Sequence, residues 1–121
     1  MNFEVIPIAS GSKGNATLLR TGRENILIDF GVSTRRMLNA LSEYRLSPDK
    51  RNGILITHEH GDHIKGLDVF TKKFDVPIYM PIEIADMNFP FLRRAEIRLF
   101  CHEESFSIGG TGIMPFEVPH D

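Results

Sequence analysis

Short apolar stretches alternate with turns rich in glycine, serine and asparagine over the first thirty residues. Residues 3–8, 16–20 and 26–29 are short, mostly apolar segments, which predict three strands. The turns between them lie at residues 9–15 and 21–25, where small and polar residues gather. Strands joined by such short turns favour an antiparallel meander.

A helix is predicted next, over residues 34–44. Ser33 precedes it as an N-cap, and Met37 and Leu41 recur at the spacing of one helical face. The run over residues 53–57 is apolar almost throughout, which is typical of a strand buried on both faces of a sheet. A histidine-rich segment follows this strand directly.

The rest of the chain alternates further helices with strands. We expect, in order, a helix over 64–74, a strand over 76–80, a short helix over 81–87 and strands over 97–100, 105–108 and 113–118. A meander followed by alternating strands and helices indicates an α/β (α+β) fold, in which helices flank a mixed β-sheet.

The composition fits one globular domain, with 121 residues of which 41% are hydrophobic. The 14 basic and 16 acidic side chains give a net charge of −2, so bulk charge does not indicate a nucleic-acid binder. The single cysteine, Cys101, cannot form an internal disulfide and fits a reducing compartment. Because we find neither a secretory leader nor an apolar run of about 18 residues, we expect a cytoplasmic protein without a membrane span.

Four possible metal ligands lie within six residues: His58, His60, Asp62 and His63. Residues two apart in extended backbone point the same way, so His58 and His60 can reach one ion. Gly61 is expected to let the backbone turn and bring Asp62 and His63 towards a neighbouring point. Imidazole and carboxylate ligands without nearby thiols suit zinc, manganese or iron.

A lone histidine at a strand end is usually structural, but this cluster is expected to bind metal. Protonated imidazoles so close together would repel one another without an ion between them. A catalytic zinc keeps an open position for water and lowers the pKa of that water to about 7, which makes hydroxide available at neutral pH. Asp62 would hold a second metal, or would orient the nucleophile if only one metal binds.

The segment over residues 57–63 matches the His-x-His-x-Asp-His signature and resembles the metallo-β-lactamase superfamily. Asp29 ends a strand where that superfamily has a structural aspartate, and His120 closes a later strand where it has its next metal-binding histidine. The segments over residues 9–16 and 60–66 look like the bacterial YycJ (WalJ)-like branch of metal-dependent hydrolases.

The resemblance implies an αββα sandwich with divalent metal ions, up to two, at the edge of its sheets. It implies that His58, His60 and His120 bind one metal. Asp62 and His63 would bind the other, and zinc is the expected ion. The branch is similar to nucleases of this fold, so the resemblance also implies a nucleic acid or another phosphodiester as substrate.

The resemblance covers all 121 residues but only about the first half of a typical family domain. The bridging aspartate and the final histidine of the family come from further along the chain and are missing here. We therefore expect residues 1–121 to form a single, truncated domain with impaired or absent activity. The missing half would leave apolar faces exposed and favour a homo-oligomer.

Three further residues have weaker signals. Ser12 and Asn15 lie in the first turn and could approach a substrate phosphate, although an ordinary hairpin turn explains the same residues. Asp29 could orient a metal-bound histidine from behind, although it could equally be a turn residue before Gly31.

Three functions stay open on these grounds. The first is a hydrolase whose metal-bound hydroxide attacks a phosphodiester, with Asp62 in the catalytic centre. The second is hydrolysis of a thioester or lactone by the same metals, because fold and metal do not dictate the substrate. The third is a truncated metal-binding or interaction module without catalysis.

Overall fold

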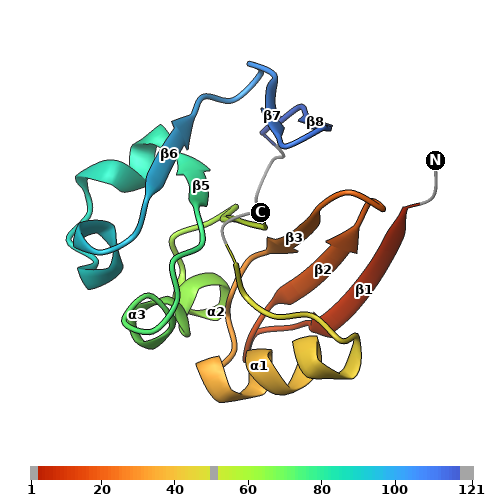
Figure 1. The fold of residues 1–121 in the computed structure, drawn as a ribbon. Helices are drawn as coiled ribbons and strands as arrows, with labels where there is room; N and C mark the ends of the chain where they lie inside the picture. The colour runs from red at the N-terminus through yellow and green to blue at the C-terminus, as the bar shows by residue number, and fades with distance from the viewer. Residues whose placement is uncertain (1–2, 50–51, 118–121) are drawn as a thin grey trace.

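The computed structural model describes residues 3–49 and 52–117, and six of their strands form one sheet (Figure 1). The strands lie in the order of the chain: β1 (Glu4–Ala9), β2 (Ala16–Arg20), β3 (Asn25–Ile28), β4 (Gly53–Leu55), β5 (Ile78–Pro81) and β6 (Ile97–Phe100). Strands β1 to β3 are antiparallel, whereas β3 to β6 run parallel. The predicted meander and mixed sheet are confirmed.

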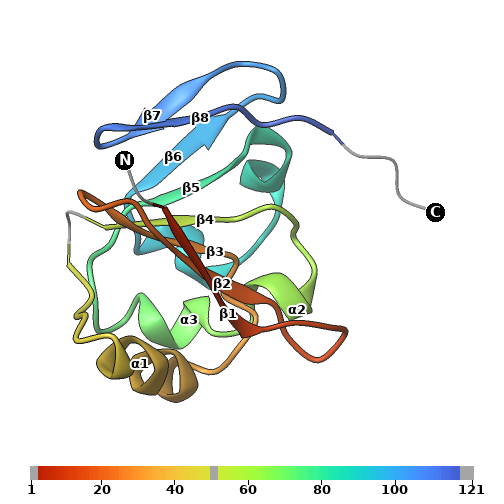
Figure 2. The ribbon, with the colours of Figure 1, turned by 90° about the vertical axis from the view of Figure 1, so that its right-hand side faces the viewer.

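Helices cover one face of this sheet, and a hairpin covers part of the other (Figure 2). These elements are α1 (Thr34–Glu43), α2 (Gly61–Ile64), α3 (Leu67–Phe70) and the hairpin strands β7 (Phe106–Ile108) and β8 (Thr111–Ile113). The larger apolar core packs between the sheet and the helices and includes Phe30, Met37, Ile54, Leu67 and Phe70. A smaller cluster links the sheet to the hairpin through Ile26, Tyr79, Phe100 and Ile108.

Strand β3 shows how the sheet divides its side chains and aligns its ends. Ile26 belongs to the hairpin cluster, whereas its neighbour Leu27 belongs to the larger core. Ile28 lies opposite Leu55 in the parallel pairing with β4, so both strands end at the same level. Asp29 and the histidine-rich segment therefore leave the sheet side by side, at the carboxyl ends of β3 and β4.

Helix α1 begins where the sequence predicts. The Ser33 hydroxyl oxygen accepts a hydrogen bond from the Arg36 backbone N–H at 3.2 Å, which satisfies one of the first amides of the helix. Met37 and Leu41 are buried on the face that meets the sheet.

The helix predicted over 64–74 is wrong in its bounds, because the structure has two short helices, α2 and α3, with Gly66 between them. The Gly66 backbone N–H donates to the Phe30 carbonyl at 3.0 Å. A Cβ at Gly66 would lie 2.1 Å from the Val32 carbonyl oxygen. The helix is therefore interrupted at Gly66, because this residue packs closely against the segment that follows β3.

Later bounds also differ from the prediction. The helix expected over 81–87 is a 3-10 helix, η1 (Ile82–Asp86), and a second one, η2 (Pro90–Arg93), was not predicted. The strand expected over 113–118 is wrong, since β8 begins at Thr111 and residues 114–117 form no strand. The Glu24 carboxylate explains the early hairpin, because it accepts hydrogen bonds from the Gly110 N–H at 3.0 Å and the Thr111 hydroxyl at 2.8 Å.

Some large apolar side chains stay exposed near the two edge strands and after the hairpin. They are Phe3, Val5, Leu99, Met114 and Phe116. No helix within residues 3–49 and 52–117 combines the length and apolar character that crossing a membrane requires.

Backbone contacts hold residues 57–63, the metal motif, against the segment after β3. The Gly31 N–H donates to the Asn15 carbonyl at 2.8 Å. A Cβ on Gly31 would lie 1.7 Å from the Asp62 carbonyl oxygen and 2.6 Å from the Asn15 backbone nitrogen. Both neighbours are backbone atoms, so this position requires glycine.

We expect Gly31→Ala to lower the free energy of unfolding by about 3 kcal/mol, because the added methyl group must push packed backbones apart. Urea denaturation measures this change. Gly61→Ala is the matched control, since a Cβ at Gly61 meets nothing within 4 Å. Its stability should change by less than about 1 kcal/mol, and equal losses in the two variants would contradict the role of Gly31.

Candidate metal centre

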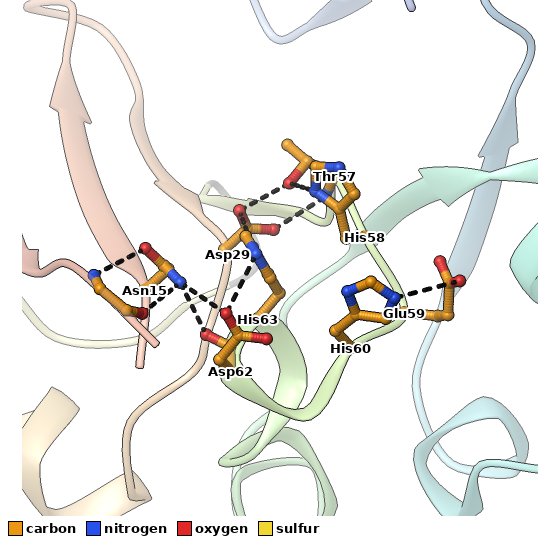
Figure 3. Close-up of polar contacts among 9 residues, drawn as sticks. Asn15, Asp29, Thr57, His58, Glu59, His60, Asp62 and His63 are labelled. Atoms are coloured by element: carbon orange, nitrogen blue, oxygen red, sulfur yellow. Dashed lines mark hydrogen bonds and ion pairs between the residues drawn. The ribbon is translucent and has the colours of Figure 1, made fainter. Parts of the chain in front are cut away.

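The candidate ligands gather at the sheet edge where β3 and β4 end and α2 begins (Figure 3). His58 and His60 lie between β4 and α2, and Asp62 and His63 lie in α2 itself. The turn between β1 and β2 approaches the other side of α2 and brings Asn15 next to Asp62. The structure therefore brings together the four side chains of the predicted cluster.

Asp29 anchors this group from the end of β3. Its side chain is buried, and its backbone φ of 65° is a left-handed conformation that aspartate tolerates better than most residues. Oδ1 accepts a hydrogen bond from the Thr57 backbone N–H at 2.8 Å. Oδ2 lies 2.7 Å from the Thr57 hydroxyl and 2.7 Å from Nδ1 of His63. Both carboxylate oxygens are thus bonded to the metal motif.

These bonds determine which ring nitrogens can bind a metal. Nδ1 of His63 donates to Asp29, which leaves the imidazole lone pair on Nε2. The Thr57 hydroxyl donates to Asp29, so its oxygen accepts from Nδ1 of His58 at 2.9 Å. The lone pair of His58 is then also on Nε2. One carboxylate therefore sets the tautomers of two candidate ligands, one directly and the other through Thr57.

The spacing of one pair of side chains, Asp62 and His63, fits coordination of a single ion. The ring centroids of His58 and His63 are 4.8 Å apart, and those of His58 and His60 are 6.1 Å apart. Nε2 of His63 lies 3.5 Å from Oδ2 of Asp62. Two ligand atoms on a tetrahedral zinc, each about 2.1 Å from the ion, are about 3.4 Å apart. Asp62 and His63 are therefore spaced to share one ion.

His60 is the most exposed member of the cluster, with 69% of its side chain accessible to solvent. Its Nε2 lies 3.8 Å from Oε1 of Glu59 (Figure 3). A carboxylate beside one ring nitrogen favours metal binding through the other, which is Nδ1 in His60. Gly61 follows without a positive φ, so the bend towards α2 does not depend on a glycine conformation.

The described residues supply pairs of ligands and do not form a complete shell. Within residues 3–49 and 52–117, no group of three or more His, Cys, Asp or Glu side chains has the geometry of a metal site. His120, the expected third ligand of the first metal, lies outside the described residues, as does Asp121. The imidazole and carboxylate donors that are present fit a divalent ion of the zinc, manganese or iron type.

The two residues expected to bind substrate lie in different surroundings. Ser12 is exposed in the turn between β1 and β2. Asn15 is half-buried, and its Nδ2 donates to the Gly11 carbonyl at 2.9 Å and to Oδ2 of Asp62 at 3.0 Å. A substrate-binding role stays a prediction for both residues.

Sequence reasoning assigned no role to Thr57 or Glu59. The sequence signal for Thr57 is its position. It directly precedes the candidate ligand His58 and follows β4, which runs parallel to β3 and so brings Thr57 close to Asp29. The sequence signal for Glu59 is weaker. Its neighbours on both sides are histidines, and its carboxylate could pair with either of them.

The fold and the ligand cluster define the class of protein, and the family comparison agrees. Residues 9–112 match the family model of the metallo-β-lactamase superfamily, and the chain belongs to that superfamily. It is 32% identical to the exodeoxyribonuclease WalJ of Streptococcus pneumoniae strain D39 over 126 aligned positions, which cover 100% of this chain and 47% of that protein. The chain thus spans about half the length of this relative.

Other relatives match over shorter segments. The chain is 40% identical to the exodeoxyribonuclease YycJ of Bacillus anthracis over 79 residues, which cover 65% of this chain and 29% of that protein. It is 42% identical to a hydroxyacylglutathione hydrolase of Baumannia cicadellinicola over 60 residues, which cover 50% of this chain and 22% of that protein.

A solved structure supports the fold. Zinc-bound PqqB from Methylobacterium extorquens superposes with a TM-score of 0.67 at 18% identity, over 87% of this chain and 42% of that one. This likeness confirms the expected metallo-β-lactamase fold, of which the sheet, its helical layer and the hairpin form a part.

We expect Thr57→Val to weaken zinc binding about 10-fold, because the variant loses the hydroxyl through which Asp29 orients His58. Zinc titration against a competing chelator measures the affinity. Thr57→Ser keeps the hydroxyl and should restore the affinity. Thr71→Val is the matched control, since the Thr71 hydroxyl donates to the Leu67 carbonyl within α3, outside the ligand cluster. Unchanged affinity in Thr57→Val would contradict the relay.

Proposed function

We propose that this protein is a metal-dependent phosphodiesterase of the nuclease type. The observation that carries the proposal is the 3.5 Å separation of Asp62 Oδ2 and His63 Nε2, next to the ring of His58. This arrangement suits a metal centre, and the family's exodeoxyribonuclease relatives favour a nucleic acid as the substrate.

Two divalent ions would be held by different parts of the cluster. His58, His60 and His120 would hold the first ion, while Asp62 and His63 would hold the second. Such ions, most suitably zinc, with manganese or iron as alternatives, would supply an activated water and a Lewis acid for hydrolysis.

The chain's own residues position that chemistry. Asp29 and Thr57 hold the rings of His58 and His63 so that the required lone pairs are on Nε2. Asp62 serves as a ligand or orients the attacking water. The exposure of His60 leaves the site accessible from solvent, as a polymeric substrate requires.

A cationic groove supports a nucleic acid as the substrate. It lies next to the segment that follows His63, has a volume of about 600 Å³, and is bounded by residues of α1 and α3. Arg35, Lys65 and Lys73 line it, and the lining residues in the described part of the chain include no carboxylate. Phosphate groups are the anions that such a groove would attract.

Thioester hydrolysis is the second candidate. The hydroxyacylglutathione hydrolase relative favours it, because the same metal centre can polarise an acyl carbonyl. Lactone hydrolysis belongs to the same chemistry. A protein that bound metal tightly but hydrolysed none of these substrates would instead be a non-catalytic metal-binding module.

We further propose that the protein acts in the cytoplasm and self-associates. Cys101 is a free thiol, as a reducing compartment would preserve it. Exposed apolar side chains at both edges of the sheet, such as Val5 and Leu99, favour contact with a second copy.

We expect the full-length protein to hydrolyse DNA and bis-nitrophenyl phosphate in the presence of zinc or manganese, whereas residues 1–121 alone should have impaired or absent activity. Asp62→Asn should lower either rate by about 100-fold or more, because a metal ligand is lost, and a chelator should abolish both rates. His102→Gln removes an imidazole outside the cluster and serves as the control. Hydrolysis of a thioester alone would reject the nuclease proposal in favour of the second candidate.

Charge reversal in the groove tests the substrate class. We expect Lys65→Glu combined with Lys73→Glu to weaken DNA binding about 10-fold and to reduce its salt dependence, while hydrolysis of bis-nitrophenyl phosphate stays unchanged. Fluorescence anisotropy with labelled DNA measures the binding. Lys72→Glu is the matched control, because Lys72 is exposed next to Lys73 but does not line the groove. Equal losses of DNA binding in Lys72→Glu and in the double variant would argue against the groove as the surface that binds DNA.

A further inference from the structure

Asn15 joins the turn between β1 and β2 to the metal motif through its side chain as well as its backbone. Its Nδ2 donates to Oδ2 of Asp62 at 3.0 Å and to the Gly11 carbonyl at 2.9 Å. Its Oδ1 accepts a hydrogen bond from the Gly11 backbone N–H at 3.2 Å. Both hydrogens of the amide nitrogen are thus engaged, one within the turn and the other by Asp62.

The bonds to Gly11 fix the orientation of the amide. Rotating the amide of Asn15 by 180° would place its nitrogen against the Gly11 N–H and its oxygen against the Asp62 carboxylate. Both contacts would be repulsive, so the nitrogen must face Asp62. The turn therefore presents Asp62 with a neutral hydrogen-bond donor.

The carboxylate oxygen that receives this bond is the one that faces His63. Oδ2 of Asp62 lies between the amide of Asn15 and the ring of His63 in Figure 3. One lone pair of Oδ2 is occupied by Asn15, and the other is available to an ion shared with Nε2 of His63. This bond also hinders rotation of the carboxylate, which two-oxygen ligation of one ion would require.

The side-chain hydrogen bond from Asn15 to Asp62 is not required to hold the turn in place. The Asn15 backbone N–H donates to the Asp62 carbonyl at 2.6 Å, and its carbonyl accepts from the Gly31 N–H at 2.8 Å. These backbone bonds already tie the turn to both neighbouring segments. The contact between Nδ2 and Oδ2 acts in addition on the group that would bind the metal.

We infer that Asn15 is a positioning residue of the metal centre, which holds Asp62 so that a single oxygen binds the second ion together with His63. The inference rests on the proposed metal centre but not on the identity of the substrate. It gives Asn15 a role other than the phosphate contact expected from its turn.

Metal titration of Asn15→Ala tests the inference. The second equivalent of zinc should bind about 10-fold more weakly than in the wild-type protein, while the first equivalent is unchanged. Cobalt(II) in place of zinc should absorb less strongly in the visible range, because an Asp62 free to bind through two oxygens raises the coordination number. A merely structural role would lower the melting temperature without changing the second affinity or this spectrum.

Asn15→Asp keeps the test decisive if the alanine variant fails to fold. Aspartate still offers an acceptor to the Gly11 N–H, but it places a like charge against Oδ2 of Asp62. Because an ion bound beside the two carboxylates relieves this repulsion, the second zinc affinity should rise, and the cobalt(II) absorption should still weaken because Oδ2 has lost its hydrogen-bond donor. Asn39→Asp adds the same charge at an exposed position of α1 and should leave both affinities unchanged.

Unchanged second affinities in both Asn15 variants, or a wild-type protein that binds only one equivalent, would overturn the inference. These results are separate from those that decide the proposed function. A protein that binds two ions but cleaves only thioesters would refute the nuclease proposal and leave the role of Asn15 intact.

Discussion

The hydrogen bonds of the Asp29 carboxylate are the interaction on which the end of the sheet depends, where β3 and β4 finish and the candidate ligands gather. Among the described residues, Asp29 is the only buried side chain that carries a formal charge. A buried charge costs free energy unless hydrogen bonds compensate it, and here they come from Thr57 and His63. The bonds that stabilise the carboxylate also orient the rings of His58 and His63. The stability of this end of the sheet and the geometry of the candidate ligands therefore have the same origin.

Much of the fold could be predicted because its signals are local. The meander, the capped helix α1 and the mixed sheet follow from short apolar runs, turn residues and the hydroxyl of Ser33. The break between α2 and α3 and the early hairpin could not be predicted. Each depends on a contact distant in sequence, Gly66 with Phe30 in one case and Glu24 with Gly110 in the other.

The candidate site divides in the same way. Four candidate ligands within six residues are visible in the sequence, since their spacing alone gathers them. The parts played by Thr57 and Asn15 were missed. The link from Thr57 to Asp29 needs the parallel pairing of β3 with β4, and the link from Asn15 to Asp62 spans 47 positions along the chain. His120 stays a prediction, because it lies outside the described residues.

The close packing of Gly31 against Asp62 and Asn15 has a consequence for how such a site can diversify. The turn before β2 is fastened by main-chain atoms at its Asn15 end, whereas Ser12 and Lys13 at its tip are exposed. Replacing the tip residues would alter the rim of the candidate site without shifting the candidate ligands. Changing the length of the turn would shift them. Substitutions at the tip of the turn are therefore a way for proteins with this fold to acquire a new substrate selectivity.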